Sequence, residues 1–107
     1  MIELDPFNTI RDRYYIVDEG IRKGIIDYVI DENGDVFIQM LKVYEEFRLN
    51  GVGRKTVYYL KDKYSDKMIY GDSLPKSIEF WRNIGVLFTG KPEYKTRRDD
   101  LVHFVIK

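Results

Sequence analysis

The sequence predicts one α/β domain of the α+β kind, in which two helices pack on a mixed, mainly antiparallel sheet. Three observations support this fold class. Runs rich in apolar and β-branched residues fill the chain before residue 44, as in an antiparallel meander. The apolar spacing changes to that of a helix after residue 51, and a second helical stretch follows a short strand-like run. The predicted order is β-β-β-α-β-α-β-β, in a single domain over residues 1–107.

The first three strands are predicted from composition and turn signals. Residues 13–20 form a β-rich run that closes on an Asp-Glu-Gly turn, and residues 22–31 alternate apolar side chains on one face. Asn33 and Gly34 suit the positive φ angles of a type I′ hairpin turn. Residues 36–43 are almost continuously apolar, which is typical of a central strand covered on both faces.

A helix of about 12–14 residues is predicted to begin at Val52. Val57, Leu60 and Tyr64 follow one another at spacings that place them on one face of a helix. This face should pack against the sheet.

The remaining elements alternate between strand and helix. Residues 67–71 predict a short strand, and residues 73–85 predict a second helix that ends at a glycine. The last two strands are predicted at 86–90 and 101–107, with a charged loop at 91–100 between them.

Composition excludes several classes of function. Lys and Arg together number 18, as do Asp and Glu, so the net charge is zero, which argues against a general nucleic-acid or membrane-surface binder. The chain has no cysteine and one histidine, so neither a zinc site nor another metal site is expected. No signal-peptide pattern is present, and no apolar run approaches the ~18–20 residues that cross a bilayer, so we expect a cytoplasmic location.

The segment FRLNGVGRKT, residues 47–56, carries the main functional signal. Glycine-rich loops before helices bind phosphate groups, because a bare backbone lets phosphate oxygens approach its N–H groups. A P-loop requires a glycine immediately before its Lys-Thr pair, and Arg54 occupies that position. The segment is therefore not a P-loop.

A dinucleotide-binding loop remains an alternative. Gly51 and Gly53 match the first two glycines of that fingerprint, but its third position is Thr56, and seven residues separate Gly51 from the preceding strand. Asp72 nevertheless lies about 20 residues further on, where an acidic residue would bind a ribose.

Residues 41–53, LKVYEEFRLNGVG, resemble the coenzyme A-binding motif of the GNAT acetyltransferase superfamily. That motif consists of a strand, about four residues, the pattern [RQ]-x-x-G-x-[GA] and a helix. Arg48, Gly51 and Gly53 occupy its specified positions.

A second segment, residues 77–88, is similar to the A-x-x-F-Y-x-x-x-G-F stretch of the same family. Phe80 and Gly85 match, Ser77 stands for the small residue, and Trp81 replaces the tyrosine. The two segments lie in the family's order and at about its spacing.

The resemblance implies an acetyl-CoA-dependent N-acetyltransferase. In the family, the strand before the loop splays from its neighbour, its last residues pair with the pantetheine arm, and the pyrophosphate lies on the amides that begin the helix. The resemblance assigns cofactor binding to Leu41, Lys42, Val43, Arg48, Leu49, Asn50, Gly51, Val52, Gly53, Arg54 and Lys55.

The resemblance leaves the catalytic residues open. The family's usual acid is the tyrosine that Trp81 replaces, and an indole N–H is not an acid at neutral pH. Oxyanion stabilisation is expected from a backbone N–H near Val43. His103 is expected to be a structural or surface histidine. The candidates for acid and base are Glu45, Glu46, Tyr70 and Ser77.

The sequence leaves open both the shape of the acceptor site and two further hypotheses about function. Family members begin with a strand and one or two helices that wall the acceptor site, whereas only some 12 residues precede the first strand predicted here. The acceptor, a small-molecule or protein amine, would then meet an open groove or one completed by a second subunit of a homodimer.

Two alternatives to an enzyme remain. The domain is a degenerate GNAT relative that binds coenzyme A or a partner, or it is an unrelated protein that binds another phosphate ligand.

Overall fold

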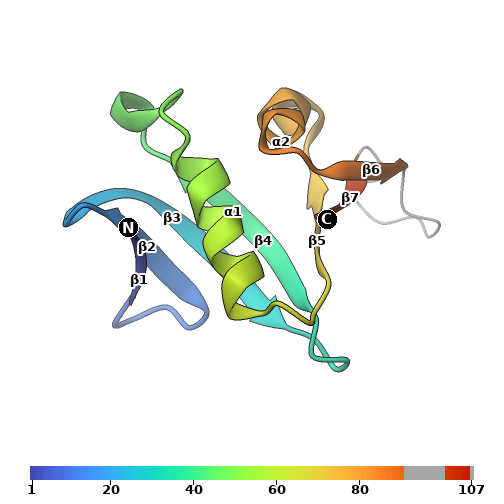
Figure 1. Ribbon diagram of the computed structural model, residues 1–107, viewed down its shortest axis with the longest axis horizontal. Helices are drawn as coiled ribbons and strands as arrows, with labels where there is room; N and C mark the ends of the chain where they lie inside the picture. Colours follow the sequence, from blue (N-terminus) through green and yellow to red (C-terminus); the bar gives the residue numbers. More distant parts are fainter. Residues whose placement is uncertain (91–100, 107) are drawn as a thin grey trace.

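The computed structural model of the protein describes residues 1–90 and 101–106, so the predicted loop at 91–100 and the last residue lie outside the described residues (Figure 1). The strands are β1 (Ile2–Pro6), β2 (Arg13–Asp18), β3 (Ile21–Ile30), β4 (Val36–Val43), β5 (Ile69–Ser73), β6 (Leu87–Gly90) and β7 (Val102–Ile106). The helices are α1 (Val52–Lys63) and α2 (Ile78–Ile84), preceded by the short 3₁₀ turns η1 (Glu45–Phe47) and η2 (Pro75–Ser77). Neither of these described helices is long and apolar enough to span a bilayer.

The seven strands form one sheet in the order β1-β2-β3-β4-β5-β7-β6. Neighbouring strands are antiparallel except β4 and β5, which run parallel. The prediction of a mixed, mainly antiparallel sheet with two helices is therefore confirmed.

The predicted element order is wrong at its beginning, because β1 precedes the first predicted strand. β1 pairs with β2 from Ile2 opposite Asp18 to Pro6 opposite Tyr14, and Ile2 is buried. The strand is short and ends in a proline, which an edge strand tolerates because one side of its backbone needs no partner. Because of these two properties, the sequence pattern did not predict this strand.

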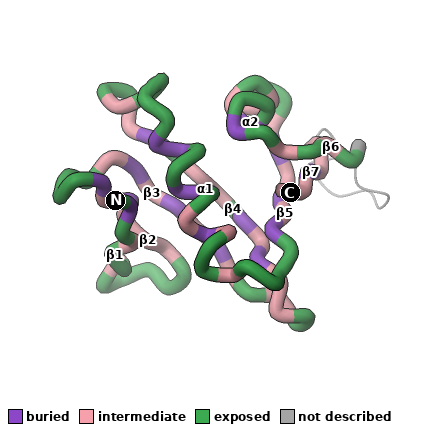
Figure 2. The backbone as a smooth tube through the Cα atoms, in the orientation of Figure 1, coloured by how far each residue is buried: buried purple, intermediate pink, exposed green. Residues whose placement is uncertain are grey.

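Both helices pack on the same face of the sheet. The buried side chains of α1 include Val57 and Leu60, as predicted, and Val52; they join one hydrophobic cluster with the buried side chains of the strands. Figure 2 shows buried positions along α1 and along the central strands. Trp81 of α2 belongs to the same cluster and stacks on Phe104 of β7, with ring centroids 4.3 Å apart.

The opposite face carries no helix in the described part of the chain, so the prediction that β4 is covered on both faces is wrong. Gln39 and Lys42 are exposed and Phe37 is only half-buried. A continuous apolar run does not reveal whether one or both faces of a strand are covered.

The predicted type I′ turn also lies elsewhere. Of the turn after β3 only Gly34 has a positive φ, 83°, while Asn33 does not, because the Asp31 carboxylate accepts hydrogen bonds from two backbone N–H groups and fixes another turn. Glu19 and Gly20, with φ of 55° and 77°, form the two-residue turn between β2 and β3.

The second helix is shorter than predicted. Residues 73–77 do not belong to it, because Ser73 ends β5 opposite Val102 and η2 follows. Gly85 ends the helix as predicted, in a left-handed conformation with φ of 99°.

Candidate functional site

The central strands β4 and β5 part from each other along most of β4. They pair only from Val36 opposite Ile69 to Ile38 opposite Gly71. Beyond this point β4 continues to Val43 with no described strand beside it on that side. Figure 1 shows the two strands diverging towards the end of the sheet where α1 begins. We call this opening the β4–β5 gap.

The backbone of β4 presents hydrogen-bonding groups to the gap. Tyr44 N donates to Lys23 O at 2.9 Å, so the residues of β4 that bond to β3 alternate with residues that face away from it. Leu41 and Val43 are the residues whose N–H and C=O groups point into the β4–β5 gap. Arg48 Nε donates to Val43 O at 3.1 Å, so the N–H is the backbone group that Val43 still offers to the gap.

The loop before α1 lies at the wide end of the gap and is exposed from Arg48 to Gly51. Leu49 has a φ of 68° and is 102% exposed, and Gly51, the N-cap, has a φ of 76°. The first hydrogen bond of the helix runs from Lys55 N to Gly51 O at 3.0 Å. No hydrogen bond in the described residues uses the N–H groups between Leu49 and Arg54. These donors and the positive end of the helix dipole favour an anion.

Space in front of the loop differs between its two glycines. No atom lies within 4 Å of the position a Cβ would take on Gly51, so the main chain there is open to a ligand. On Gly53, by contrast, a Cβ would stand 2.9 Å from Phe80 Cζ and 3.4 Å from Ile84 Cδ1. Of the two glycines, only Gly51 has the open main chain that close approach of an anion would need, whereas Gly53 is required by the contact between α1 and α2.

The three basic side chains predicted to attract phosphate all make contacts within the protein. The guanidinium of Arg54 donates to Asn83 O at the end of α2, and Lys55 Nζ lies 3.3 Å from Asp18 Oδ2. The third is Arg48, which holds Val43 as described above. These contacts join Arg48 to the end of β4 and join the start of α1 to α2 and β2, so the backbone amides offer the more direct contact for an anion.

Asp18 fixes the start of α1 over the sheet. Its buried carboxylate accepts hydrogen bonds from three cations. These are Lys55 Nζ, Lys23 Nζ at 3.4 Å and the terminal amino group of Met1 at 3.3 Å. Burial by itself would raise the pKa of Asp18, but the hydrogen bonds from these three cations outweigh it and leave the pKa below its ordinary value.

The four candidate catalytic residues lie at different places. Glu45 and Glu46 are exposed on η1, near the wide end of the gap, and Ser77 lies on η2. Tyr70 lies on β5, where the strands still pair, and its hydroxyl donates to Asp31 Oδ2 at 2.8 Å. Burial and this carboxylate raise the pKa of Tyr70 to about 12. The structure does not bring these four residues together.

Sequence reasoning missed a histidine–aspartate pair beside the gap. His103 Nδ1 lies 2.9 Å from Asp72 Oδ1, across the register of β7 and β5. The ring of His103 is 5.9 Å from that of Tyr70. Two-residue alternation could have placed both side chains on one face, but the register between the two strands could not be read from the sequence.

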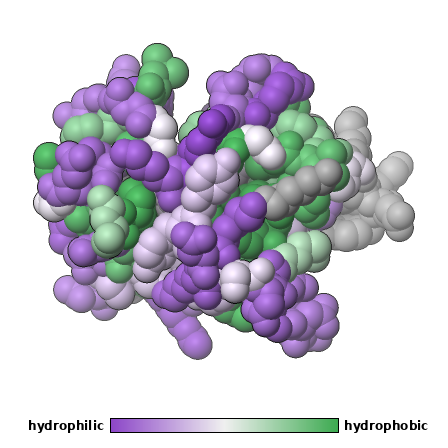
Figure 3. Space-filling model, viewed as in Figure 1, coloured by the Kyte–Doolittle hydropathy of each residue, from purple (hydrophilic) through white to green (hydrophobic). Residues whose placement is uncertain are grey.

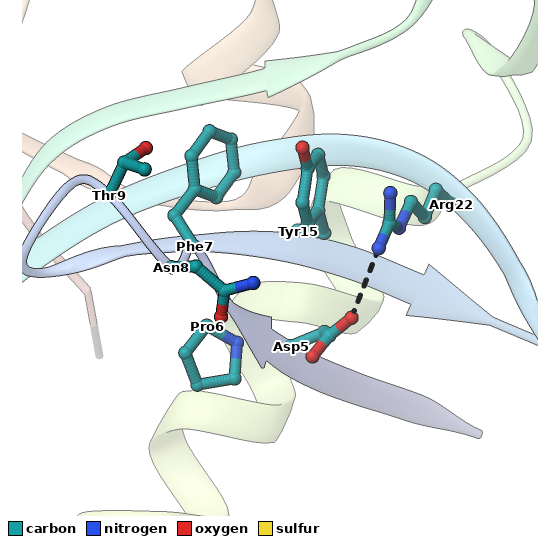
Figure 4. A pocket seen from close by; sticks show the side chains of 7 residues that line it. All are labelled: Asp5, Pro6, Phe7, Asn8, Thr9, Tyr15 and Arg22. Atoms are coloured by element: carbon teal, nitrogen blue, oxygen red, sulfur yellow. Dashed lines mark hydrogen bonds and ion pairs between the residues drawn. The ribbon is translucent and has the colours of Figure 1, made fainter.

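A shallow pocket lies at the far edge of the sheet, away from the gap (Figure 4). The rings of Phe7 and Tyr15 stack in it with centroids 4.1 Å apart, and the guanidinium of Arg22 lies 3.9 Å from the ring of Tyr15. Arg22 also pairs with Asp5. The charges that line the pocket thus compensate one another, and we assign it no part in the site.

The helix-bearing side of the molecule is mainly hydrophilic. Figure 3 shows polar residues over α1 and most of this face, with hydrophobic residues gathered beneath α2.

Comparison with solved structures establishes the fold. Ard1 from Thermoplasma volcanium is 15% identical, with a TM-score of 0.65 over 88% of this chain and 68% of that one. An acetyltransferase from Thermus thermophilus is 15% identical, with a TM-score of 0.68 over 91% of this chain and 65% of that one. Naa50 from Arabidopsis thaliana, in complex with the bisubstrate analogue CoA-Ac-MVNAL, is 21% identical, with a TM-score of 0.60 over 87% and 70%.

This chain thus spans about two thirds of the length of these structures. No family profile matches the sequence, and no curated protein matches it. The fold predicted from the two sequence segments is confirmed by the likeness in structure alone.

Proposed function

We propose that this chain, which has the GNAT fold, binds acetyl-CoA and transfers its acetyl group to an amine. One observation carries the proposal: the β4–β5 gap ends at a loop whose amides have no acceptor within the described residues. The diphosphate of the cofactor would lie on the amides between Leu49 and Arg54. The pantetheine arm would extend along the gap and pair with Leu41 and Val43, as an added strand would.

The solved structures support acetyl-CoA as the cofactor. Arabidopsis Naa50 was captured with an analogue that joins CoA, through an acetyl group, to a peptide. The same fold extends over 87% of this chain. A cofactor with an anionic diphosphate and an amide-rich arm matches the free amides of the loop and the strand edge of β4.

The reaction moves the acetyl group from sulfur to nitrogen and removes two protons from the acceptor ammonium ion. The amine acceptor loses a proton, and its nitrogen attacks the thioester carbonyl carbon. The C–N bond forms, the C–S bond breaks, and the departing thiolate takes the second proton of the amine. Because the pantetheine arm would pair with Val43 and Leu41, the carbonyl oxygen would accept a hydrogen bond from a backbone N–H of β4 beyond Leu41, towards the narrow end of the gap, as charge develops on it.

A coenzyme A- or partner-binding module without transfer activity is the alternative, and one observation favours it. Trp81 occupies the place of the family's acidic tyrosine, and it is buried against Phe104. This side chain serves the core and cannot protonate a thiolate.

Two measurements test the proposal. Acetyl-CoA should raise the melting temperature of the protein, because a ligand that binds only the folded state stabilises it. Release of free thiol should then be followed with a panel of small amines and of peptides with free amino termini. Stabilisation with thiol release supports transfer, stabilisation without it supports the binding module, and no stabilisation rejects both.

A further inference from the structure

We propose that His103 is the general base of the acetyl transfer and that Asp72 positions its ring; this inference rests on the proposed function. Three features support it: the face on which the pair lies, its position along the sheet relative to the point where the strands part, and a ring nitrogen that has no hydrogen-bond partner among the described residues.

The pair lies on the face of the sheet opposite the helices. Phe104 faces α2, on whose Trp81 it stacks, so His103 next to it points to the other side. On β5, Gly71 packs against Phe104, so Asp72 likewise points away from the helices. The loop at the start of α1 belongs to the helix-bearing side. A cofactor held there leaves the other face for the acceptor, and that face carries no helix in the described residues.

The pair also lies where the strands begin to part. Gly71 is the last residue of β5 that pairs with β4. Asp72 follows it directly, and His103 stands opposite Asp72 on the next strand. A thioester at the narrow end of the β4–β5 gap would therefore have this pair beside it.

The hydrogen bond defines the role of each ring nitrogen. An ionised carboxylate only accepts hydrogen bonds, so Nδ1 of His103 carries the proton that it donates to Asp72 over 2.9 Å. The other nitrogen, Nε2, then has a lone pair, and it has no partner among the described hydrogen bonds. The side chain of His103 is 35% exposed, so an acceptor can reach it.

Within the described strands, the ionisable groups that face His103 favour a cationic acceptor. Asp72 and Tyr70 face it from β5, and on the other side the residue in register on β6 is Gly90. Tyr70 is neutral at physiological pH, whereas Asp72 is a carboxylate that also stabilises the imidazolium formed on proton uptake.

The proposed step is balanced in protons and electrons. The acceptor enters as an ammonium ion and gives one proton to Nε2 of His103. The neutral amine then attacks the thioester carbonyl, and its second proton passes to the thiolate as the C–S bond breaks. The imidazolium finally releases its proton to water, so that each cycle yields the N-acetyl product, CoA as a thiol and one proton.

The experiment compares His103→Gln, Asp72→Asn and a matched control, Asp5→Asn, with the wild-type chain. Asp5 also pairs with a cationic side chain, Arg22, but on β1 at the far edge of the sheet. For each protein we would measure the melting temperature, the Kd for acetyl-CoA and kcat over a range of pH. His103→Ala with added imidazole serves as a chemical rescue, and His103→Asn replaces His103→Gln if the latter does not fold.

We expect His103→Gln to lower kcat by about 10²–10⁴-fold, to leave the Kd for acetyl-CoA unchanged and to remove the acidic limb of the pH profile. Asp72→Asn should lower kcat as well, and Asp5→Asn should not. Unchanged kcat in His103→Gln overturns the assignment and leaves the acetyl transfer intact. A wild-type chain that binds acetyl-CoA but acetylates no amine overturns both the transfer and its base, whereas a chain that does not bind it rejects the cofactor site too.

The role of Asp72 has a readout independent of activity. His103 is the only histidine of the sequence, so its ring nitrogens can be observed by NMR without assignment. The wild-type spectrum should show the tautomer protonated on Nδ1, and Asp72→Asn should shift the ring towards a mixture of tautomers. A wild-type ring protonated on Nε2 would overturn the arrangement.

Discussion

Gly53 of α1 lies so close to the ring of Phe80 that a Cβ added to it would stand 2.9 Å from Phe80 Cζ. We predict that Gly53→Val destabilises the protein by about 1–3 kcal/mol, because the added methyl groups overpack the junction of the two helices. Denaturant unfolding measures the change. Adding Phe80→Leu should recover part of the loss, and strictly additive effects of the two substitutions would contradict the proposed contact.

Gly51 is open to solvent but has a left-handed backbone, with φ of 76°. We predict that Gly51→Glu abolishes acetyl-CoA binding while the fold survives, because it places a negative charge where the diphosphate would lie. The strain should cost about 1–2 kcal/mol of stability. Gly51→Asn is the control, since asparagine tolerates this conformation and adds no charge. Titration calorimetry that finds wild-type affinity in Gly51→Glu would rule out the loop as the cofactor site.

Arg48 should matter less than the backbone that follows it. Its Nε donates a hydrogen bond to Val43 O at 3.1 Å. The side chain is exposed, so solvent screens its attraction for an anion. We predict that Arg48→Ala weakens acetyl-CoA binding by less than about tenfold, because screened surface charges contribute little. A loss as large as that of Gly51→Glu would show that the side chain, and not the amides, holds the diphosphate.

Asp18 gives the protein a dependence of stability on acid pH. The folded protein holds its pKa below the ordinary value of 3.8, so its contribution is complete above that value and is lost as the pH falls through the lower, folded one. We predict that Asp18→Asn costs about 1–3 kcal/mol at neutral pH, because Lys23 and Lys55 lose their shared partner. Urea unfolding measures the free energy of unfolding of the wild type and of Asp18→Asn at neutral pH and well below pH 3.8. The difference between the two proteins should be smaller in acid.

Tyr70 is predicted to remain protonated in mild alkali. Its pKa of about 12 is raised, so the stability contributed by its hydrogen bond to Asp31 is present below the ordinary pKa of 10.0 and is lost as the pH rises through the folded value. The tyrosinate absorbance that the wild type shows and Tyr70→Phe lacks should appear with a midpoint near pH 12. Asp31→Asn should move this midpoint towards 10.0. Tyr70→Phe should change kcat by less than about threefold, in contrast to His103→Gln.

The sequence predicted those parts of the fold that depend on local pattern. The spacing of Val57 and Leu60 identified α1, and the residues of β4 were predicted with the bounds that the structure has. The segments at residues 41–53 and 77–88 identified the fold through their resemblance to a known family, and the structure has the strand, loop and helix of the first segment in that order. The cofactor residues assigned by resemblance stay predictions.

Long-range geometry could not be predicted in the same way. β1 is held by pairing with β2 and not by its own pattern, and Ser73 belongs to β5 because it lies opposite Val102. The contact of His103 with Asp72 depends on a register between strands that are separated by about 30 residues of chain. A single sequence contains the residues of such a pair but not their juxtaposition.

The three-residue pairing of β4 with β5 divides the sheet into two blocks joined by a narrow seam. Amides along this seam should exchange with deuterium sooner than those of the β3–β4 ladder, since fewer neighbouring hydrogen bonds must break together to expose them. A molecule that filled the opening with an amide-bearing arm would act as a missing strand and join the blocks. Occupancy of the site and rigidity of the whole sheet would then rise together.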